Sequence, residues 1–496
     1  MSHIFAPSPG RGGDDGLAML WQMAVACHQR GEMDKAEPIY RELLRQQPEN
    51  PAPLQMLGAL RLQCGDPTEA LALLDRALAQ RDDLGEAWNN RGIALKALGR
   101  LPEALASHER ALALDAQNMP ALSNRAAVLG DLQRMDEALL DLDQVLAQHP
   151  DLPALHNNRG VLLQDLRRFD EALLAYGKAI ALAPDYADAH WNEARCRLLM
   201  GDYIPGWAKY ECRWQREDFA AARRNFRSPQ WDGGALRGKT ILLHAEQGMG
   251  DTMQFLRFVP LVVAAGGRVV LEVQRPLLLL AQRIPDLVAV RAAGDRLPAF
   301  DVHCPLMSLP YVLGTTLATV PADIPYLYAD AGLSAQWAAK LAHDGARKLR
   351  IGIMWSGNAA QKDNHLRSLA LRDFLPLVRE NVELISLQKD LVSNEEREIV
   401  AAGKVQHFGA SMDDTAALMM NLDLVISVCT SMAHLAGALG CPLWVLLQSA
   451  SDWRWLLDRN DSPWYPSARL FRQERSGEWG PVIQDVVDSL AAFPAR

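Results

Sequence analysis

Three short stretches in the second half of the chain hold residue types that could bind or transform a phosphorylated ligand. The first is residues 246–251, where Gly248 and Gly250 let the backbone turn sharply and approach a ligand. Asp251 follows at the start of an expected helix. It is either a helix N-cap or a general base that takes a proton from an acceptor hydroxyl. A Gly-x-Gly-Asp motif is shorter than a dinucleotide fingerprint and decides nothing by itself.

The second stretch follows an expected strand and contains Lys362, His365 and Arg367. Cations at the end of a strand can neutralise a leaving diphosphate, although ordinary solvated charges explain them slightly better. In the third stretch, Thr430 and Ser431 begin the helix that holds His434. Hydroxyl and N–H groups at a helix N-terminus suit a phosphate, and capping alone also explains them.

Two further residues belong to these expected loops. Cys429 stands directly before Thr430, and without a supporting His–Asp arrangement we interpret it as a packed, unreactive thiol. Gln388 lies just past the end of another expected strand, the end at which open α/β sheets bind ligands.

Short β-branched runs alternating with helices surround these stretches and predict two doubly wound α/β domains that face a cleft. Chemistry in such domains lies at the carboxyl ends of the strands. The strands are expected at 239–244, 268–273, 288–291, 300–303, 349–355, 382–387, 405–408, 423–428 and 443–447.

The first half of the chain is an internal repeat of 34 residues. An alanine recurs at that spacing, and a small residue stands twelve positions before each one, where two helices of a hairpin approach closely. This pattern predicts an all-α tetratricopeptide solenoid. The alanines are Ala36, Ala70, Ala104, Ala138 and Ala172.

A second ladder of residues has the same period. Asparagines recur on the first helix of successive repeats, which in this architecture lines the concave surface, and an amide there can hold an extended polypeptide. The alternative is that the asparagines cap or bridge neighbouring repeats. They are Asn90, Asn124, Asn158 and Asn192.

These features predict five segments along the chain. They are a disordered lead-in at 1–16, the solenoid at 17–214, a linker at 215–238, and α/β halves at 239–345 and 346–496. The aromatics after the last repeat, Trp207, Tyr210 and Trp214, are expected to cap the solenoid or dock the next domain rather than bind a ligand.

The composition of the chain excludes some classes of function. A formal charge of −9 and a pI of about 5.8 speak against nucleic-acid binding as the main role. Seven scattered cysteines form neither a disulfide framework nor a metal site, which predicts a reducing cytoplasm. The most apolar stretch, 422–447, contains charged residues, glycines and a proline, so we expect a buried sheet rather than a membrane span.

Several runs together resemble a known group of proteins. They are residues 244–260 (HAEQGMGDTMQFLRFVP), 355–358 (WSGN), 366–371 (LRSLAL), 385–390 (ISLQKD), 425–447 (VISVCTSMAHLAGALGCPLWVLL) and 452–473 (DWRWLLDRNDSPWYPSARLFRQ). The chain resembles bacterial tetratricopeptide proteins with a C-terminal glycosyltransferase-like domain similar to the lipopolysaccharide heptosyltransferases. A looser resemblance is to the O-linked N-acetylglucosamine transferases, whose repeats hold protein substrates on an asparagine ladder.

The resemblance implies a GT-B fold, no essential metal, and a nucleotide-diphospho-sugar as co-substrate without a further cofactor. It makes Asp251 the catalytic aspartate and places the donor phosphates beside Thr430, Ser431 and His434. A basic residue of the family would correspond to Lys362 or Arg367. The family's aspartate before the Thr is replaced here by Cys429, which puts donor identity or activity in doubt.

The sequence thus predicts a cytoplasmic glycosyltransferase that acts on an acceptor, expected to be a protein, held by the repeats. The alternative is an inactive transferase-like scaffold that binds protein partners. Open solenoid ends often pair, so a homodimer through the repeats is a further expectation.

Overall fold

The computed structural model describes residues 14–342, 347–358 and 364–493, and the side chains of residues 16–219 and 222 onward within them. The chain divides into two compact units, Met1–Ala189 and His190–Arg496. The boundary falls near the start of the last repeat, so the second unit includes the aromatics that follow that repeat.

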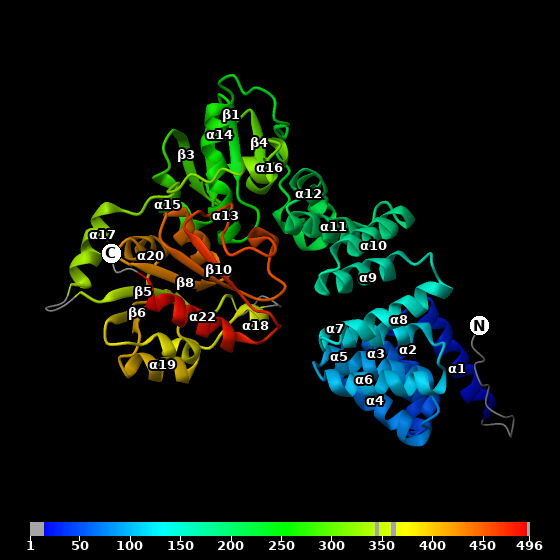
Figure 1. Ribbon diagram of the computed structural model, residues 1–496. Coiled ribbons are helices and arrows are strands. Elements are labelled where there is room, and N and C mark those ends of the chain that lie inside the picture. Colours follow the sequence, from blue (N-terminus) through cyan, green and yellow to red (C-terminus); the bar gives the residue numbers. More distant parts are fainter. Residues whose placement is uncertain (1–13, 343–346, 359–363, 494–496) are drawn as a thin grey trace. The chain divides into compact units, whose positions relative to one another are not determined.

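The first unit is a stack of antiparallel helical hairpins (Figure 1). Its helices are α1 (Asp14–Gln29), α2 (Met33–Gln46), α3 (Pro51–Gln63), α4 (Pro67–Gln80), α5 (Gly85–Ala97), α6 (Leu101–Leu114), α7 (Met119–Asp131), α8 (Met135–Gln148), α9 (Pro153–Asp165) and α10 (Phe169–Leu182). Helix α1 begins at Asp14, so the last three residues of the expected lead-in are helical. Residues 1–13 lie outside the described residues.

Close helix–helix approach explains the small residue in each repeat. A Cβ added to Gly160 would lie 2.5 Å from the Tyr176 ring, and one added to Gly58 would lie 2.8 Å from Leu74 Cγ. The turn inside each hairpin needs a left-handed residue, which glycine adopts without strain. Gln133 and Arg167 occupy that position in two repeats and have φ angles of 62° and 61°.

The second unit begins with α11 (Ala187–Met200), α12 (Tyr203–Tyr210), η1 (Glu211–Gln215) and η2 (Glu217–Ala222). Two parallel sheets follow. The first has the order β3-β2-β1-β4 and consists of β1 (Thr240–His244), β2 (Arg268–Val273), β3 (Leu287–Ala292) and β4 (Val302–Pro305).

The second sheet has the order β10-β9-β8-β5-β6-β7, again with every pair parallel. Its strands are β5 (Leu349–Met354), β6 (Val382–Ser386), β7 (Gln406–His407), β8 (Leu424–Val428), β9 (Leu443–Leu447) and β10 (Ala468–Arg472). The last strand was not expected from the sequence. The two sheets make this region an α/β structure.

Helices and 3-10 turns connect the strands. They are α13 (Met249–Phe255), η3 (Leu256–Phe258), α14 (Val259–Ala264), η4 (Arg275–Leu277), α15 (Leu278–Gln282), η5 (Leu306–Ser308), α16 (Leu309–Val312), η6 (Leu317–Thr319), α17 (Ala331–Lys340), α18 (Asn364–Arg367), η7 (Leu371–Leu377), α19 (Asn394–Ala401), α20 (Met412–Met419), α21 (Ser431–Ala438), η8 (Trp453–Trp455) and α22 (Trp479–Ala491).

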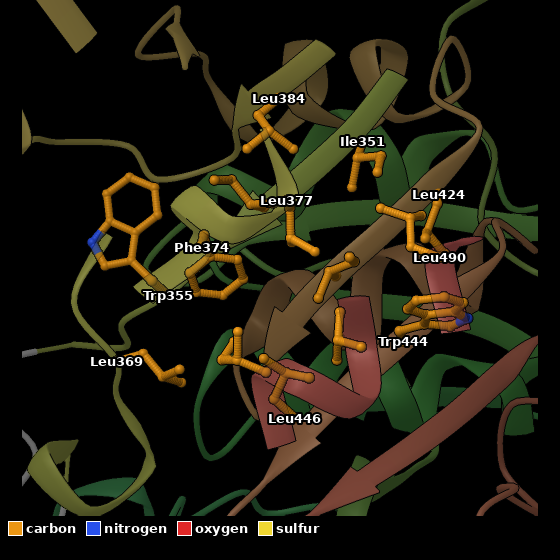
Figure 2. Packing of buried hydrophobic residues seen from close by; sticks show 14 of the residues in the cluster. Ile351, Trp355, Leu369, Phe374, Leu377, Leu384, Leu424, Trp444, Leu446 and Leu490 are labelled. Atoms are coloured by element: carbon orange, nitrogen blue, oxygen red, sulfur yellow. The ribbon is translucent and has the colours of Figure 1, made fainter. Parts of the chain in front are cut away.

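The core of the second sheet gathers side chains from many separate elements. Figure 2 shows Ile351, Leu424 and Leu446 of neighbouring strands beside Phe374 and other apolar residues of the same cluster. Strands that are covered on both faces appear as continuous apolar runs, as observed for β8 and β9. This rigid core sets the position of the loops at the strand ends.

Candidate functional site

Both sheets have a topological switch point, where ligands bind in open α/β folds. In the first sheet the chain runs from β1 outward through β2 and β3 and then returns to the other side at β4. In the second sheet β6 and β7 lie on one side of β5, and β8 to β10 on the other. The three predicted loops follow β1, β5 and β8, and therefore lie at these switch points.

Asp251 lies in the first turn of α13, and its two carboxylate oxygens have different partners. Oδ2 accepts a hydrogen bond from the Gly248 backbone N–H at 2.9 Å, and Oδ1 pairs with the Arg454 guanidinium. The side chain is 22% exposed. Burial raises the pKa of Asp251, while the charge of Arg454 acts in the opposite direction. Asp251 therefore caps the helix with one oxygen and forms an ion pair with the other.

Arg454 was not singled out from the sequence, although it lies in the resembling run at 452–473. Its Nε donates to Gln254 Oε1 at 2.7 Å and its Nη1 to Asp452 Oδ1 at 2.8 Å. The guanidinium carbon lies 4.2 Å from the centre of the Trp453 ring. Burial opposes ionisation of Asp452, but Arg454 outweighs it and the pKa of Asp452 is lowered. Arg454 thus joins the loop after β9 to the loop after β1.

Gly250 brings α13 against α21. A Cβ there would lie 2.9 Å from His434 Cδ2 and 3.4 Å from Ser431 Cα, so a larger residue would push the helices apart. The loops after β1 and β8, which are 180 residues apart in the chain, consequently meet. This contact places Gly250, the residue before Asp251, against Ser431.

His434 is a buried, packed histidine. Its Nδ1 lies 2.8 Å from the Tyr465 hydroxyl, and its ring stacks on Trp455 at 5.7 Å. Burial, with the nearby charge of Arg454, lowers the pKa of His434 to about 3, so the imidazole is neutral at pH 7. Any contact of His434 with a donor remains a prediction.

At the start of α21, Thr430 is the N-cap residue. Its hydroxyl accepts from the Met432 N–H at 3.3 Å and lies 3.2 Å from the Ser427 hydroxyl. Ser431 is half-buried beside it. Capping explains Thr430, and the Ala433 N–H donates to the Thr430 carbonyl at 3.1 Å, so a ligand at this helix start would meet Ser431 first.

The loop after β5 reaches the same place through Arg367, whose Nη1 donates to the Cys429 carbonyl at 3.2 Å. Lys362 lies outside the described residues. Cys429 Sγ accepts from the Trp455 indole N–H at 3.0 Å, and burial raises the pKa of the thiol to about 11. The thiol is therefore neutral at pH 7.

Gln388 is farther along the second sheet, after β6. Its backbone N–H donates to Ser386 Oγ at 3.2 Å, and His407 Nδ1 lies 3.1 Å from the same hydroxyl. Among the described residues no group bonds the buried Gln388 Oε1. In those same ranges no three His, Cys, Asp or Glu side chains gather as a metal-binding group.

The asparagine ladder is partly structural. Asn124 Nδ2 donates to Asn89 Oδ1 of the preceding repeat at 3.0 Å, which is the bridging role considered from the sequence. Asn158 is exposed, and Asn90 and Asn192 are half-buried. The arginines that follow the ladder bind acids of neighbouring helices, as Arg125 does with Asp141 at 2.5 and 2.7 Å.

Comparison with known proteins identifies the repeats. A tetratricopeptide repeat model matches residues 28–90, and a second one matches residues 85–118 and 153–186. The first part of the chain is therefore a tetratricopeptide-repeat solenoid. Protein FlbA of Caulobacter vibrioides is 29% identical over 330 residues, which are 60% of this chain and 54% of FlbA. The chain thus spans about half the length of this curated relative.

Solved structures are similar to part of the chain, and some of them are described as tetratricopeptide proteins. PilF of Pseudomonas aeruginosa is 19% identical with a TM-score of 0.37, over 43% of this chain and 100% of PilF. YrrB, described as a TPR protein with an unusual peptide-binding site, is 19% identical with a TM-score of 0.31, over 36% and 92% of the two chains. Among the described helices, none is both long and apolar enough to cross a membrane.

Proposed function

We propose that this chain is a glycosyltransferase of the GT-B type that moves a sugar from a nucleotide-diphospho-sugar to an acceptor, a polypeptide held by the repeats. One observation supports it most strongly. The loop of residues 246–251 after β1 (the Gly-Asp loop) meets the start of α21 after β8, with Gly250 against Ser431. This contact lies at the switch points of the two parallel sheets. An acid placed there faces the position where a phosphorylated donor is expected.

In the proposed reaction Asp251 takes the proton of an acceptor hydroxyl. The acceptor oxygen then bonds to the anomeric carbon as the bond from that carbon to the diphosphate breaks. Arg454 favours the ionised form that a base requires. Arg367, Lys362 and Ser431, with the positive end of the α21 dipole, steady the departing diphosphate, and Gln388 contacts the nucleotide.

The acceptor part of the proposal rests on the repeats. Tetratricopeptide solenoids commonly bind peptides or protein partners on an extended surface. Asn158 is exposed and Asn90 is half-buried, so their amides can meet an extended main chain. The Asn124 amide instead donates one hydrogen bond to Asn89. Asn158, Asn90 and Asn192 are therefore the members of the ladder proposed for acceptor binding.

A second candidate is a scaffold without transferase activity, and one observation favours it. The resemblance places an aspartate at the position of Cys429, which here is a half-buried neutral thiol bonded to Trp455. Such a thiol cannot replace a carboxylate in binding a donor. A scaffold would bind partners through the repeats and leave the second unit unused for catalysis.

Nucleotide-sugar binding separates the two candidates. The full chain is titrated with UDP-, GDP-, ADP-, TDP- and CMP-sugars while its thermal unfolding is followed. A donor at 100 times its Kd stabilises the folded state by about 2.7 kcal/mol, which raises the Tm by several degrees. If no nucleotide-sugar raises the Tm at millimolar concentration, the enzyme proposal is wrong and the scaffold function is favoured.

Turnover of any donor that binds then tests the base. Asp251→Asn should abolish transfer without abolishing donor binding. Asp301→Asn is the matched control, because Asp301 accepts the Thr240 N–H at 2.7 Å at the opposite end of the same strand. Full activity in Asp251→Asn would show that another group is the base.

A further inference from the structure

The loop of residues 246–251 after β1 begins with a second acid, Glu246. Its side chain is 0% exposed and pairs with Arg213, which is also 0% exposed, through two N–O contacts of 3.0 Å. The Met307 backbone N–H donates to the same carboxylate at 3.2 Å. A buried, fully paired carboxylate therefore lies five residues before Asp251.

Arg213 comes from η1, directly after the last repeat. It also donates to Glu211 Oε1 at 2.6 Å and to Ser308 Oγ at 2.7 Å, and its guanidinium lies 4.4 Å from the Trp214 ring centre. Each of these partners fixes the direction of the guanidinium. The plane that meets Glu246 is consequently set by several groups outside the loop.

A second bond joins the same segment to the loop. Gln247 Nε2 donates to the Tyr210 hydroxyl at 3.2 Å, and Tyr210 also lies 5.3 Å below Arg213. Tyr210 packs in turn on Trp191 of α11 at 4.8 Å, next to Asn192 of the ladder. The two residues before Gly248 are therefore both held by the segment that ends the repeats.

Stability alone is a weak reason for such a pair. Taking two charges out of water costs about as much as their attraction returns, and apolar residues of similar size often stabilise a fold equally well. A paired arginine and carboxylate do define direction, because two parallel hydrogen bonds form in one geometry only. Such a pair is suited to fixing the backbone that leads into the Gly248–Asp251 turn.

We propose that Arg213 is a positioning residue that holds Glu246, and through it the turn carrying Asp251, so that the segment ending the repeats sets the geometry of the site. The part of this inference that concerns turnover rests on the proposed glycosyltransferase function. The part that concerns the loop stands on the contacts of Arg213 alone. The last repeat is then a working part of the second unit rather than a cap on the solenoid.

Hydrogen exchange of the full chain tests the positioning without any ligand. In Arg213→Met the amides of residues 245–251 should exchange about tenfold faster or more, with Arg213→Lys between that variant and the wild type, while β2 amides keep their rates. Tyr210→Phe removes only the hydroxyl that Gln247 meets and should loosen the loop slightly. Arg224→Met is the matched control, because Arg224 pairs with buried Glu272 at 3.0 Å on the neighbouring strand.

A double variant shows whether Arg213 acts through Glu246. Glu246→Gln combined with Arg213→Met should exchange no faster at the loop than Arg213→Met alone. Unchanged loop exchange in both Arg213 variants, or an equal effect from Arg224→Met, would overturn the proposal. If Arg213→Met does not fold, Arg213→Lys and Tyr210→Phe decide the question by the same comparison.

Kinetics separates this inference from the proposed function. Once a donor is found, Arg213→Lys should lower kcat and leave both KM values near those of the wild type, because Arg213 is buried and touches neither substrate. A raised KM with unchanged kcat would contradict positioning. If no donor is found, the function fails while the exchange result still decides the role of Arg213.

Discussion

Replacing Arg454 by methionine removes a cation that pairs with both Asp251 and Asp452. Methionine keeps much of the side-chain volume over Trp453, so the main change is the loss of charge. Arg454 is 9% exposed, Asp251 22% and Asp452 31%, and both pairs are therefore shielded from water. Removing one partner of a buried ion pair costs about 3–5 kcal/mol, and we expect Arg454→Met to lower the free energy of unfolding by that amount at pH 8.

The penalty should depend on pH with a definite sign. Arg454 lowers the pKa of Asp251 against burial, so its removal raises that pKa further. The folded variant then takes up a proton as the pH falls through the raised pKa, while the unfolded chain does so only near about pH 3.9. Between these values the folded state binds more protons, and lowering the pH stabilises it. The penalty should therefore shrink from pH 8 to pH 5.

Urea unfolding followed by tryptophan fluorescence measures this effect in the full chain. Of the 13 tryptophans, 11 lie in residues 190–496, so the signal reports mainly the second unit. Arg459→Met is the matched control on the same loop, because Arg459 pairs with Asp461, which is 65% exposed. That pair should contribute at most about 1 kcal/mol. A penalty that is equal at pH 5 and pH 8 would show that packing on Trp453, rather than charge, is lost.

Three smaller predictions concern the repeats and the thiol. Gly160→Ala should cost about 1–3 kcal/mol, because its Cβ would meet the Tyr176 ring at 2.5 Å, whereas Gly177→Ala, with open space around it, should stabilise α10. Thermal circular dichroism that shows a stabilised Gly160→Ala or a destabilised Gly177→Ala would contradict the packing argument. In the same melts, Asn124→Ala should lose about 1 kcal/mol of stability with its bond to Asn89, and Asn158→Ala less than about 0.5 kcal/mol. Equal losses of stability would mean that Asn124 and Asn158 do not differ in structural role. Iodoacetamide at pH 8 should modify exposed Cys64 well before Cys429, whose pKa is raised to about 11 by burial. Mass spectrometry that shows the reverse order would contradict the interpretation of Cys429 as an unreactive thiol.

The repeats could be predicted from the sequence because their rules are local. Each hairpin needs a small residue at the close approach and a left-handed residue in the turn, and both recur every 34 positions. The strand ends were also predictable, since buried parallel strands are continuous apolar runs. Strand β10 was missed because two of its five residues are arginines, and only its pairing with β9 makes the segment extended.

The residues around Asp251 could not be predicted by the same means. Arg454 lies 203 positions away from Asp251, and Arg213 lies 33 positions before Glu246. In a sequence, a buried arginine has the same appearance as a solvated one, because nothing local records the acid that it will meet. The signal that existed was the run Asp452–Trp455, where two tryptophans flank an arginine beside an acid.

Whether Asp251 is a helix cap or a base can now be separated by one substitution. A cap requires only a single oxygen, and the Asp251 oxygen that accepts the Gly248 N–H could be an amide oxygen. Asp251→Asn should therefore keep the cap, while Arg454 keeps its bond to Asp452. If Asp251 is only a cap, donor binding and turnover should survive in Asp251→Asn. If it is the base, turnover should vanish while the melting temperature and donor affinity stay near those of the wild type. A carboxylate that serves only as a cap has no need of an arginine from a distant loop, and this arrangement is our reason for expecting the second result.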